Sequence, residues 1–489
     1  MYRKSSKQKE IIQRTALYVF MTLSVLVIVS GLVFAILGYR FDSENGRVEQ
    51  GSLLQFNTIP SGATIEIDGK AISAKTPAKS TTTAGDHQFV MRRDGYETWQ
   101  KSLTVAAGTL TWLDYARLVP KERPVVAVAA YETITASRAT VDGDAMLIQE
   151  SKTTPSFQLV DLTSDTVQTT TLTLPETLYS EATTPDVSHT FNIDQWDRGG
   201  RYVLIEHTYA DKKEWLVLDT RDTAASRNIT TQLRIGIDSV VFSGTSGNIL
   251  YGLSAGTIRK IDLSADTISG ALVSNVTRFE LFETNIITYV GTDQTDPTKR
   301  VAGLYREGDE TPHVLRTTTS AADVPLYIAT SRYFNESIIA ITEGNQVEIL
   351  SGDYPRSGSA DNSSLKAYGA FTFVAGIDAL SFSPAGDYVL VQSGINFASF
   401  DIERKMVHTS VLVSDGAVAV SPLTWLDDDH VWHDAGSKLV MREFDGANST
   451  TINNSVISQD VTLTPNDRYM YSIGKTADGY QLQRVRMVL

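Results

Sequence analysis

The stretches FSPAGDY at residues 382–388 and LTPNDRY at residues 463–469 have the same construction. Each places a Ser-Pro or Thr-Pro pair and a polar turn between an apolar residue and a tyrosine. Proline and small polar residues at these positions predict a tight turn. The apolar runs that follow, at residues 388–392 and 468–472, predict β-strands. The two stretches therefore indicate one hairpin unit that occurs at least twice.

The same order of turn and strand recurs eight times between residues 124 and 489, with a spacing of about 38–57 residues. The turns are at residues 142–144, 198–200, 246–248, 283–285, 334–336, 384–387, 427–429 and 465–467. A further strand follows in each unit, at residues 157–162, 214–220, 257–263, 301–306, 346–350, 397–403, 438–444 and 480–485. This period is typical of four-stranded propeller blades. Eight blades are expected, or seven if a weak unit around Asn285 or Asn335 is misread.

The two ends of the repeat region complement each other. The last unit has strands at residues 461–463, 468–472 and 480–485 and then lacks an outer strand. A spare apolar strand, PVVAVAA at residues 124–130, precedes the first turn. Pairing of this strand with residues 480–485 would close the ring and protect both sheet edges.

The stretches at 382–388 and 463–469 resemble the TolB-type repeat of WD-like β-propellers, whose turn reads Ser-Pro-Asp-Gly. Both replace the Asp-Gly pair, and the other six turns agree in spacing alone. The resemblance implies a propeller and does not imply a particular reaction.

Residues 52–120 show a second, smaller pattern of strands at 52–58, 63–68, 87–91, 98–105 and 110–118. Asp68-Gly69 is a strong hairpin signal because glycine accepts the positive φ of such a turn. The segment resembles the PEGA family in Pro60, Gly62, Ala63, Asp68, Gly69, Thr76, Pro77, Gly85, His87, Gly95 and Tyr96. Ser61 replaces the usual glutamate of the family's namesake tetrad. The resemblance implies a small β-sandwich-like domain found on extracytoplasmic and surface proteins, with Tyr96 and Trp99 in its core and no activity of its own.

Residues 16–37, ALYVFMTLSVLVIVSGLVFAIL, carry no charge and are long enough to cross a bilayer as a helix. The residues before this run are rich in lysine and arginine, which predicts a cytoplasmic N-terminus and an extracytoplasmic remainder. A cleaved signal peptide is the alternative, with a conceivable site at residues 33–35, although its apolar region is usually only about 7–15 residues long. The expected parts are a cytoplasmic tail at 1–15, a transmembrane helix at 16–38, a linker at 39–51, a PEGA-like domain at 52–120 and a propeller at 121–489.

Composition narrows the classes of function. The formal net charge is −14 and is spread along the 489 residues, which argues against a nucleic-acid partner. There is no cysteine, so disulfides, thiol catalysis, cysteine-ligated metals and a lipoprotein anchor are excluded. The domains must depend on their apolar cores.

Sequence motifs for a reaction are missing: there is no G-x-S-x-G elbow, P-loop, G-x-G-x-x-G or H-E-x-x-H. The densest polar stretch is DDDHVWHD at residues 427–434. Its carboxylates and imidazoles could bind a divalent cation, but strand alternation would direct His430 and His433 to opposite faces. A blade turn is the preferred interpretation. We therefore expect no catalytic residue, cofactor or metal site.

Other candidates for binding are weaker. Trp196, Tyr209 and Trp425 could be exposed aromatics that stack on sugars, or they could pack between blades. The polar insertion at residues 353–364 is either a partner-binding loop or a tolerated insertion. Asn228, Asn275 and Asn448 start Asn-x-Ser/Thr triplets that would be glycosylated only in a host with that machinery.

The sequence as a whole predicts a mainly β, single-pass membrane protein that displays a propeller for protein or glycan recognition at the cell envelope. The alternatives are an envelope hydrolase or lyase with its site at the channel mouth, or a structural subunit of a surface layer or secretion assembly. Converging carboxylates with raised pKa values would favour the enzyme. A channel lined by Thr, Ser and apolar residues would favour the scaffold, and a large apolar patch on the rim would favour the structural subunit.

Overall fold

The computed structural model describes residues 7–36, 39–42, 47–181, 187–355, 364–412, 422–456 and 459–489. The chain divides into two compact units, Met1–Glu122 and Arg123–Leu489. The first unit begins with helix α1, Lys7–Ile36. Its apolar part, Ile11–Phe34, is long and apolar enough to cross a membrane and is not covered by the rest of the protein. Where the sequence indicates a linker, strands β1 (Tyr39–Asp42) and β2 (Arg47–Gln50) pair as a hairpin.

Residues 52–117 form two sheets. One sheet has the order β6-β3-β9, and the other has the order β5-β4-β7-β8. Their bounds are β3 Ser52–Ile59, β4 Thr64–Ile67, β5 Lys70–Lys75, β6 Ala78–Thr82, β7 Gly85–Arg92, β8 Trp99–Val105 and β9 Leu110–Arg117. The five predicted strands are present, and β5 and β6 are additional. As expected, Asp68 and Gly69 turn the chain with positive φ, and Tyr96 and Trp99 are buried.

Thr76 explains one part of the sequence pattern in this domain. Its buried Oγ1 accepts hydrogen bonds from the backbone N–H groups of Gly62 (3.1 Å) and Ala63 (2.9 Å) and lies 2.6 Å from Thr58 Oγ1. One hydroxyl therefore holds three segments of the small domain together. The spaced Gly, Ala and Thr residues are structural.

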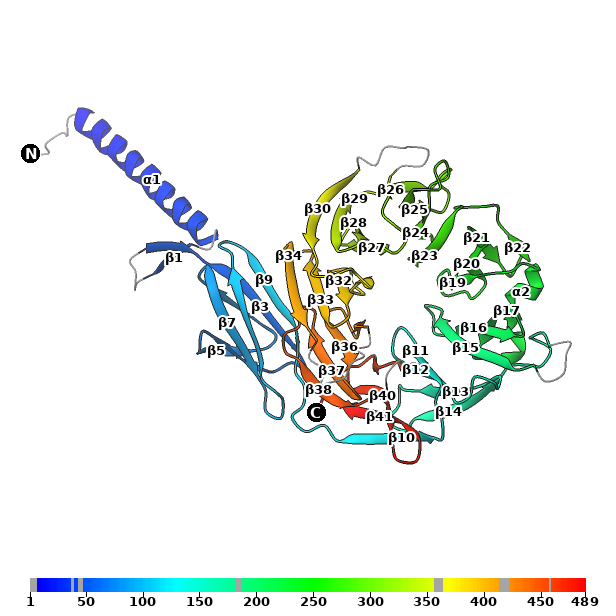
Figure 1. Ribbon diagram of the computed structural model, residues 1–489. Helices are drawn as coiled ribbons and strands as arrows, with labels where there is room; N and C mark the ends of the chain where they lie inside the picture. The colour runs from blue at the N-terminus through cyan, green and yellow to red at the C-terminus, as the bar shows by residue number, and fades with distance from the viewer. Residues whose placement is uncertain are drawn as a thin grey trace, which may run out of the picture. The chain divides into compact units, whose positions relative to one another are not determined.

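The second unit contains eight four-stranded antiparallel sheets within its described residues, and Figure 1 shows them arranged as a ring. We number them blades 1–8 in chain order.

Blade 1 consists of β11 Ala136–Ala139, β12 Ala145–Gln149, β13 Ser156–Asp161 and β14 Gln168–Thr173, and blade 2 of β15 His189–Trp196, β16 Tyr202–Tyr209, β17 Lys212–Asp219 and β18 Arg227–Asn228. Blade 3 consists of β19 Ser239–Phe242, β20 Ile249–Ser254, β21 Thr257–Asp262 and β22 Thr267–Ile268, and blade 4 of β23 Val276–Phe282, β24 Ile286–Thr292, β25 Arg300–Arg306 and β26 His313–Thr318. Blade 5 consists of β27 Leu326–Tyr333, β28 Glu336–Glu343, β29 Gln346–Gly352 and β30 Leu365–Thr372, and blade 6 of β31 Ala379–Phe382, β32 Tyr388–Ser393, β33 Asn396–Asp401 and β34 Met406–Val411. Blade 7 consists of β35 Thr424–Trp425, β36 His430–Asp434, β37 Lys438–Glu443 and β38 Thr450–Asn454, and blade 8 of β39 Thr462–Leu463, β40 Tyr469–Lys475, β41 Tyr480–Arg486 and β10 Val125–Tyr131. A short helix, α2 (Ile229–Leu233), follows β18.

Blade 8 is completed by the first strand of the propeller. Strand β10 pairs antiparallel with β41, with Val125 opposite Val485 and Tyr131 opposite Tyr480. The predicted closure is therefore confirmed, and the weak units around Asn285 and Asn335 are both true blades. The count is eight in the part of the chain that the structure describes.

The hydrophobic cores lie between neighbouring blades. One core combines Phe157 of blade 1 with Phe191, Val203 and Leu216 of blade 2. The core between blades 8 and 1 includes Tyr471 and Ile473 together with Met146 and Ile148. Because each sheet is covered on both faces by its neighbours, a strand buries side chains in both directions.

The eight predicted turns connect the first and second strands of their blades. They lie on one face of the ring because every blade follows the same path; we call this the turn face. Neighbouring turns are joined directly: Arg198 N donates to Gly244 O (3.3 Å), and Ser243 Oγ donates to Thr284 O (2.6 Å). The turns of blades 2, 3 and 4 are thus connected to one another.

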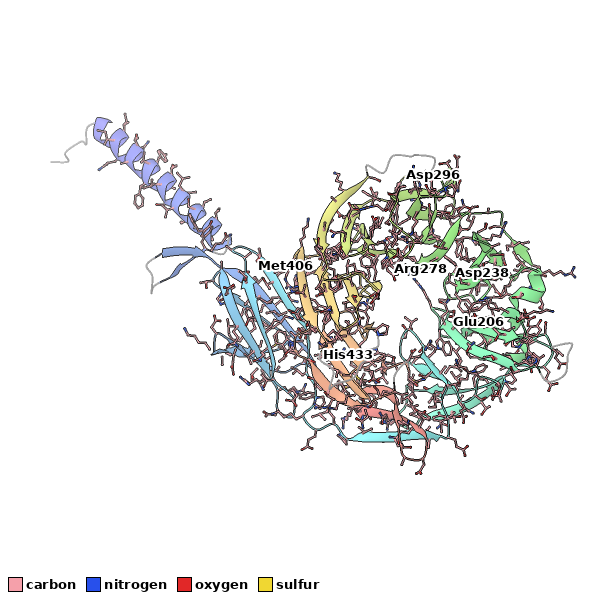
Figure 2. All side chains as sticks on the ribbon, viewed as in Figure 1. Glu206, Asp238, Arg278, Asp296, Met406 and His433 are labelled. Atoms are coloured by element: carbon pink, nitrogen blue, oxygen red, sulfur yellow. The ribbon has the colours of Figure 1, made fainter. Side chains whose placement is uncertain are left out.

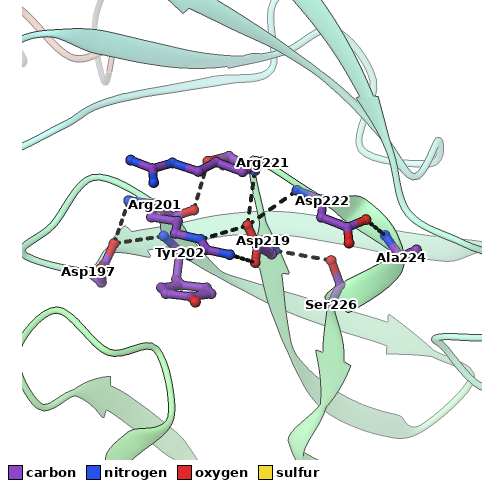
Figure 3. Close-up of polar contacts among 9 residues, drawn as sticks. Asp197, Arg201, Tyr202, Asp219, Arg221, Asp222, Ala224 and Ser226 are labelled. Carbon is purple, nitrogen blue, oxygen red and sulfur yellow. Dashed lines mark hydrogen bonds and ion pairs between the residues drawn. The ribbon is translucent and has the colours of Figure 1, made fainter.

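Figure 3 shows how blade 2 fixes its turn and the connection after β17. The buried carboxylate of Asp197 accepts hydrogen bonds from the N–H groups of Arg201 (2.8 Å) and Tyr202 (2.7 Å). The Arg201 guanidinium then donates to Asp219 from Nε (3.1 Å) and from Nη2 (2.7 Å). Asp219 also accepts from Arg221 N (3.0 Å) and begins the next turn. These acidic residues shape backbone.

Candidate functional site

The polar stretch at residues 427–434 forms a turn and strand β36, as the preferred interpretation predicts. His430 Nδ1 lies 2.9 Å from Asp427 Oδ1 within the turn. His433, three residues further along the strand, is fully buried, and its pKa is lowered to about 4 by burial and by Arg442. Among the described residues, no group of three or more His, Cys, Asp or Glu is arranged to hold a metal ion.

The aromatic candidates pack between blades. Trp196 is buried and donates from Nε1 to the backbone oxygen of Arg138 in blade 1 (3.0 Å). Trp425 is half-buried and donates to Ser381 Oγ in blade 6 (3.1 Å). Tyr209 is also buried. Of the two alternatives that the sequence left open, packing agrees with the structure for Trp196 and Tyr209, because both side chains are buried.

The remaining candidates from the sequence are the polar insertion and three asparagines. Most of the insertion at 353–364 lies outside the described residues, namely residues 356–363. In its described first part, the Tyr354 hydroxyl lies 3.0 Å from Thr330 Oγ1 in blade 5. Asn228 is buried and caps α2 by accepting from Thr231 N (3.0 Å), so it is inaccessible to a glycosylating enzyme. Asn275 and Asn448 both have positive φ, which suits turns.

Strand pairing in blade 2 creates a cluster that the sequence did not reveal. His207 on β16 is opposite Glu214 on β17, and Tyr209 is opposite His189 on β15. Ser180, which precedes β15, completes the group. We call Ser180, His189, His207, Tyr209 and Glu214 the histidine cluster.

The histidine cluster is a chain of hydrogen bonds that runs from a buried carboxylate to a half-buried imidazole. Glu214 accepts from Ser180 N (3.1 Å) and Ser180 Oγ (2.5 Å), and its Oε2 lies 3.2 Å from His207 Nδ1. His207 Nε2 lies 2.9 Å from His189 Nδ1. Burial would raise the pKa of Glu214, but hydrogen bonds from His207, Ser180 and Asn228 outweigh burial and lower the pKa to about 2.

The order of groups decides what the histidine cluster can do. With Glu214 ionised, His207 Nδ1–H donates to it, so Nε2 of a neutral His207 accepts the proton of His189 Nδ1. A hydrolase would need a hydroxyl against that nitrogen. The hydroxyl of Ser180 is bonded to Glu214 instead. Among the described residues, the cluster therefore lacks the arrangement of a nucleophilic triad.

Other charged side chains lie toward the centre of the ring. Figure 2 shows Glu206, Asp238 and Arg278, from blades 2, 3 and 4, near the centre of the ring. Burial raises the pKa values of Asp194 and Glu280, although both side chains still meet solvent.

Arginine side chains lie near these acidic residues. Arg138 Nε donates to the backbone oxygen of Asp194 (3.2 Å), and its Nη1 lies 3.3 Å from Asp460 Oδ1. Burial raises the pKa of Asp460 as well. Arg278 stacks on the ring of Tyr327 at 4.2 Å and lowers the pKa of Glu280 against the effect of burial. The raised pKa values alone do not meet the condition set for an enzyme, which requires that such carboxylates converge.

These geometries can be set beside known proteins. Residues 52–121 match the family model of the PEGA domain. The match agrees with the two-sheet structure and with the spaced Pro, Gly and Thr residues. The PEGA domain covers a small part of the chain, and the comparison with curated proteins found no match.

The solved structures that are similar include a β-propeller domain. Hsv2 of Kluyveromyces lactis is 12% identical, with a TM-score of 0.38, over 73% of this chain and 99% of that one. The Cps50 (Swd1) β-propeller domain of Myceliophteria thermophila is 10% identical, with a TM-score of 0.41, over 67% of this chain and 98% of that one. The fold of residues 123–489 as a propeller follows from its own strand topology, which leaves the TolB and WD40 kinds undistinguished.

Proposed function

We propose that the protein is a membrane-anchored scaffold at the cell envelope that binds a protein partner through the turn face of its propeller. In this proposal α1 crosses the membrane with its N-terminus in the cytoplasm, and the parts assigned to residues 52–120 and 121–489 are extracytoplasmic. The basic residues before the apolar run support this orientation. A propeller suits a scaffold because its closed ring presents loops without an ordering cost on binding.

Phe334 is the observation that carries the proposal. It lies at the tip of the turn between β27 and β28, and 83% of its side chain is exposed. It also has φ +50°, and it is the only aromatic among the non-glycine residues with positive φ in the described chain. A bulky residue in this region costs roughly 1–2 kcal/mol, where glycine or asparagine would fit without strain. An exposed aromatic kept at that cost points to a binding role.

The surroundings of Phe334 have the composition of a protein-binding surface. Tyr333 packs edge-on against it, with ring centroids 4.7 Å apart. The adjacent Arg332 forms an ion pair with Glu283 of the neighbouring turn (3.2 Å). Aromatic residues and arginine dominate the energetic centres of protein interfaces. We infer a partner with an apolar pocket that receives Phe334.

The test compares two exposed apolar residues on opposite faces. The full chain in lipid nanodiscs is used to capture partners from envelope extracts, as wild type, Phe334→Asn and Val374→Asn. Val374 is 71% exposed in the connection before β31, away from the turn face. We expect Phe334→Asn to lose a specific captured protein at least tenfold while the free energy of unfolding stays equal or rises by about 1 kcal/mol. Equal capture by Phe334→Asn and wild type would refute the proposal.

A further inference from the structure

A pocket opens between blades 3 and 4, at the end of blade 4 opposite the turn face. It encloses about 240 Å³ and is lined by segments before β23, after β24 and before β26. Its walls combine the side chains of three valines and Pro312 with hydroxyl groups and one carboxylate. These lining residues are Val273, Ser274, Tyr289, Thr292, Asp293, Gln294, Thr295, Val301, Thr311, Pro312 and Val314.

Tyr289 is the reason to regard this pocket as a binding site. Only 3% of the residue is exposed, and its ring lies across Gly303, where a Cβ would come within 2.5 Å of the phenol oxygen. Within the described chain this hydroxyl makes no hydrogen bond, and Tyr289 is one of the residues that line the pocket. A buried tyrosine usually finds a partner for its hydroxyl. Burial and the charge of Asp293 raise the pKa of Tyr289, so the group remains a donor.

Asp293 supplies the complementary acceptor. Its Oδ1 accepts from Thr295 N (2.8 Å), Thr295 Oγ1 (2.6 Å) and Asp296 N (3.0 Å), which fixes the carboxylate at the start of the β24–β25 loop. These bonds lower the pKa of Asp293 and keep it ionised. Its second oxygen is left for a ligand. Asp296, labelled in Figure 2, marks this loop.

The pocket thus offers a fixed donor, a fixed anionic acceptor and the hydroxyls of Ser274, Thr292 and Thr311, which can donate or accept. An anionic ligand would be repelled by Asp293. An ammonium would satisfy Asp293 but would leave the Tyr289 donor unpaired, which is costly in a buried position. A neutral polyol presents both donors and acceptors around an apolar ring edge that suits the valines. The volume lies below the range of roughly 300–1,000 Å³ for drug-sized ligands, so a single ring fits.

We propose that this pocket binds one neutral sugar unit, with Asp293 accepting from sugar hydroxyls and Tyr289 donating to a ring or hydroxyl oxygen. The site is independent of the partner surface at Phe334, so either can fail without the other. Asp262 provides a matched control for Asp293. Its carboxylate makes the same three turn contacts, to Ser264 N (2.9 Å), Ser264 Oγ (2.5 Å) and Ala265 N (3.1 Å), and it does not line the pocket.

The experiment titrates the full chain in nanodiscs with a panel of neutral methyl hexosides and methyl N-acetylhexosaminides, and with n-butylammonium as the cationic probe. Saturation-transfer NMR detects weak binding. We expect a glycoside to bind, with Tyr289→Phe weakening it about fivefold and Asp293→Asn weakening it at least about tenfold, as expected for loss of a neutral and of a charged hydrogen bond. Asp262→Asn should leave affinity unchanged.

Three results would overturn the proposal. One is that no glycoside of the panel binds to a protein whose circular dichroism shows it to be folded. Another is that glycoside binding is the same in Tyr289→Phe, Asp293→Asn and wild type, which would place the sugar elsewhere. The third is preference for n-butylammonium, with loss in Asp293→Asn and no change in Tyr289→Phe, which would make the pocket a cation site.

Discussion

Glu214→Gln in blade 2 removes a buried negative charge from the histidine cluster while it keeps the size of the side chain. Glu214 is 3% exposed and accepts hydrogen bonds from Ser180 and His207. The amide can accept at one atom only, and its NH₂ group would face a donor of Ser180 or His207. We therefore expect the variant to be less stable than wild type at neutral pH.

The pKa of Glu214 gives the size and the pH range of the effect. The value falls from 4.5 to about 2 on folding, and each pKa unit is worth about 1.36 kcal/mol, so ionised Glu214 contributes about 3 kcal/mol. Because the folded pKa is the lower one, this contribution is complete above pH 4.5 and is lost as the pH falls from 4.5 to 2. At pH 3 about 2 kcal/mol of it should be gone.

The assay is urea unfolding of the full chain in nanodiscs at pH 7 and pH 3, followed by tryptophan fluorescence. Trp215 is buried beside Glu214 on β17 and reports locally. Wild type should lose about 2 kcal/mol more than Glu214→Gln between the two pH values. Glu206→Gln, which removes a partly exposed carboxylate paired with Lys213 in the same blade, should follow wild type. Parallel loss in wild type and Glu214→Gln would refute the assignment of charge to this cluster.

Two further predictions concern the ring. Asp460→Ala removes the acceptor of the Ala139 N–H (3.0 Å) between blades 8 and 1, and should cost about 1–2 kcal/mol in thermal unfolding, whereas Asp165→Ala, which removes a largely exposed ion pair, should cost less than about 0.5 kcal/mol. Gly247→Ala should cost more than about 2 kcal/mol, because Gly247 has φ +63° and a Cβ would lie 2.4 Å from the Tyr202 ring. Gly270→Ala, where a Cβ meets nothing within 4 Å, should leave the melting temperature unchanged. Equal melting temperatures for the two glycine variants would contradict this packing.

The propeller could be predicted because its turns depend on local chemistry. Ser383 and Thr464 show why: each side-chain oxygen accepts the N–H of the tyrosine that begins the next strand, at 3.1 Å in both cases. A Ser-Pro or Thr-Pro pair before a tyrosine is visible in the sequence, so the turn is too. The strand that closes blade 8 was also predictable. The sequence has one apolar strand that belongs to no unit and one unit that lacks a strand, so pairing the two completes the blade.

The candidate sites could not be predicted, because they depend on register and backbone angles. His189, His207 and Glu214 are brought together by the pairing of three strands, and nothing in their spacing fixes that pairing. The positive φ of Phe334 contradicts the preference of its own side chain, so no sequence rule would place it there. For Trp196 the sequence left exposure and packing both open, because it does not show which side of a strand a neighbouring blade covers; in the structure Trp196 is buried and donates to Arg138 of blade 1.

Closure of the ring by β10 and β41 has a consequence for folding during synthesis. The first strand of the propeller, β10, is synthesised long before its partner β41. Until β41 is available, the propeller remains an open arc whose two terminal sheets have unpaired edges. Such edges are templates for mispairing with other chains. We therefore expect a chain truncated before β41 to aggregate rather than to form a smaller ring.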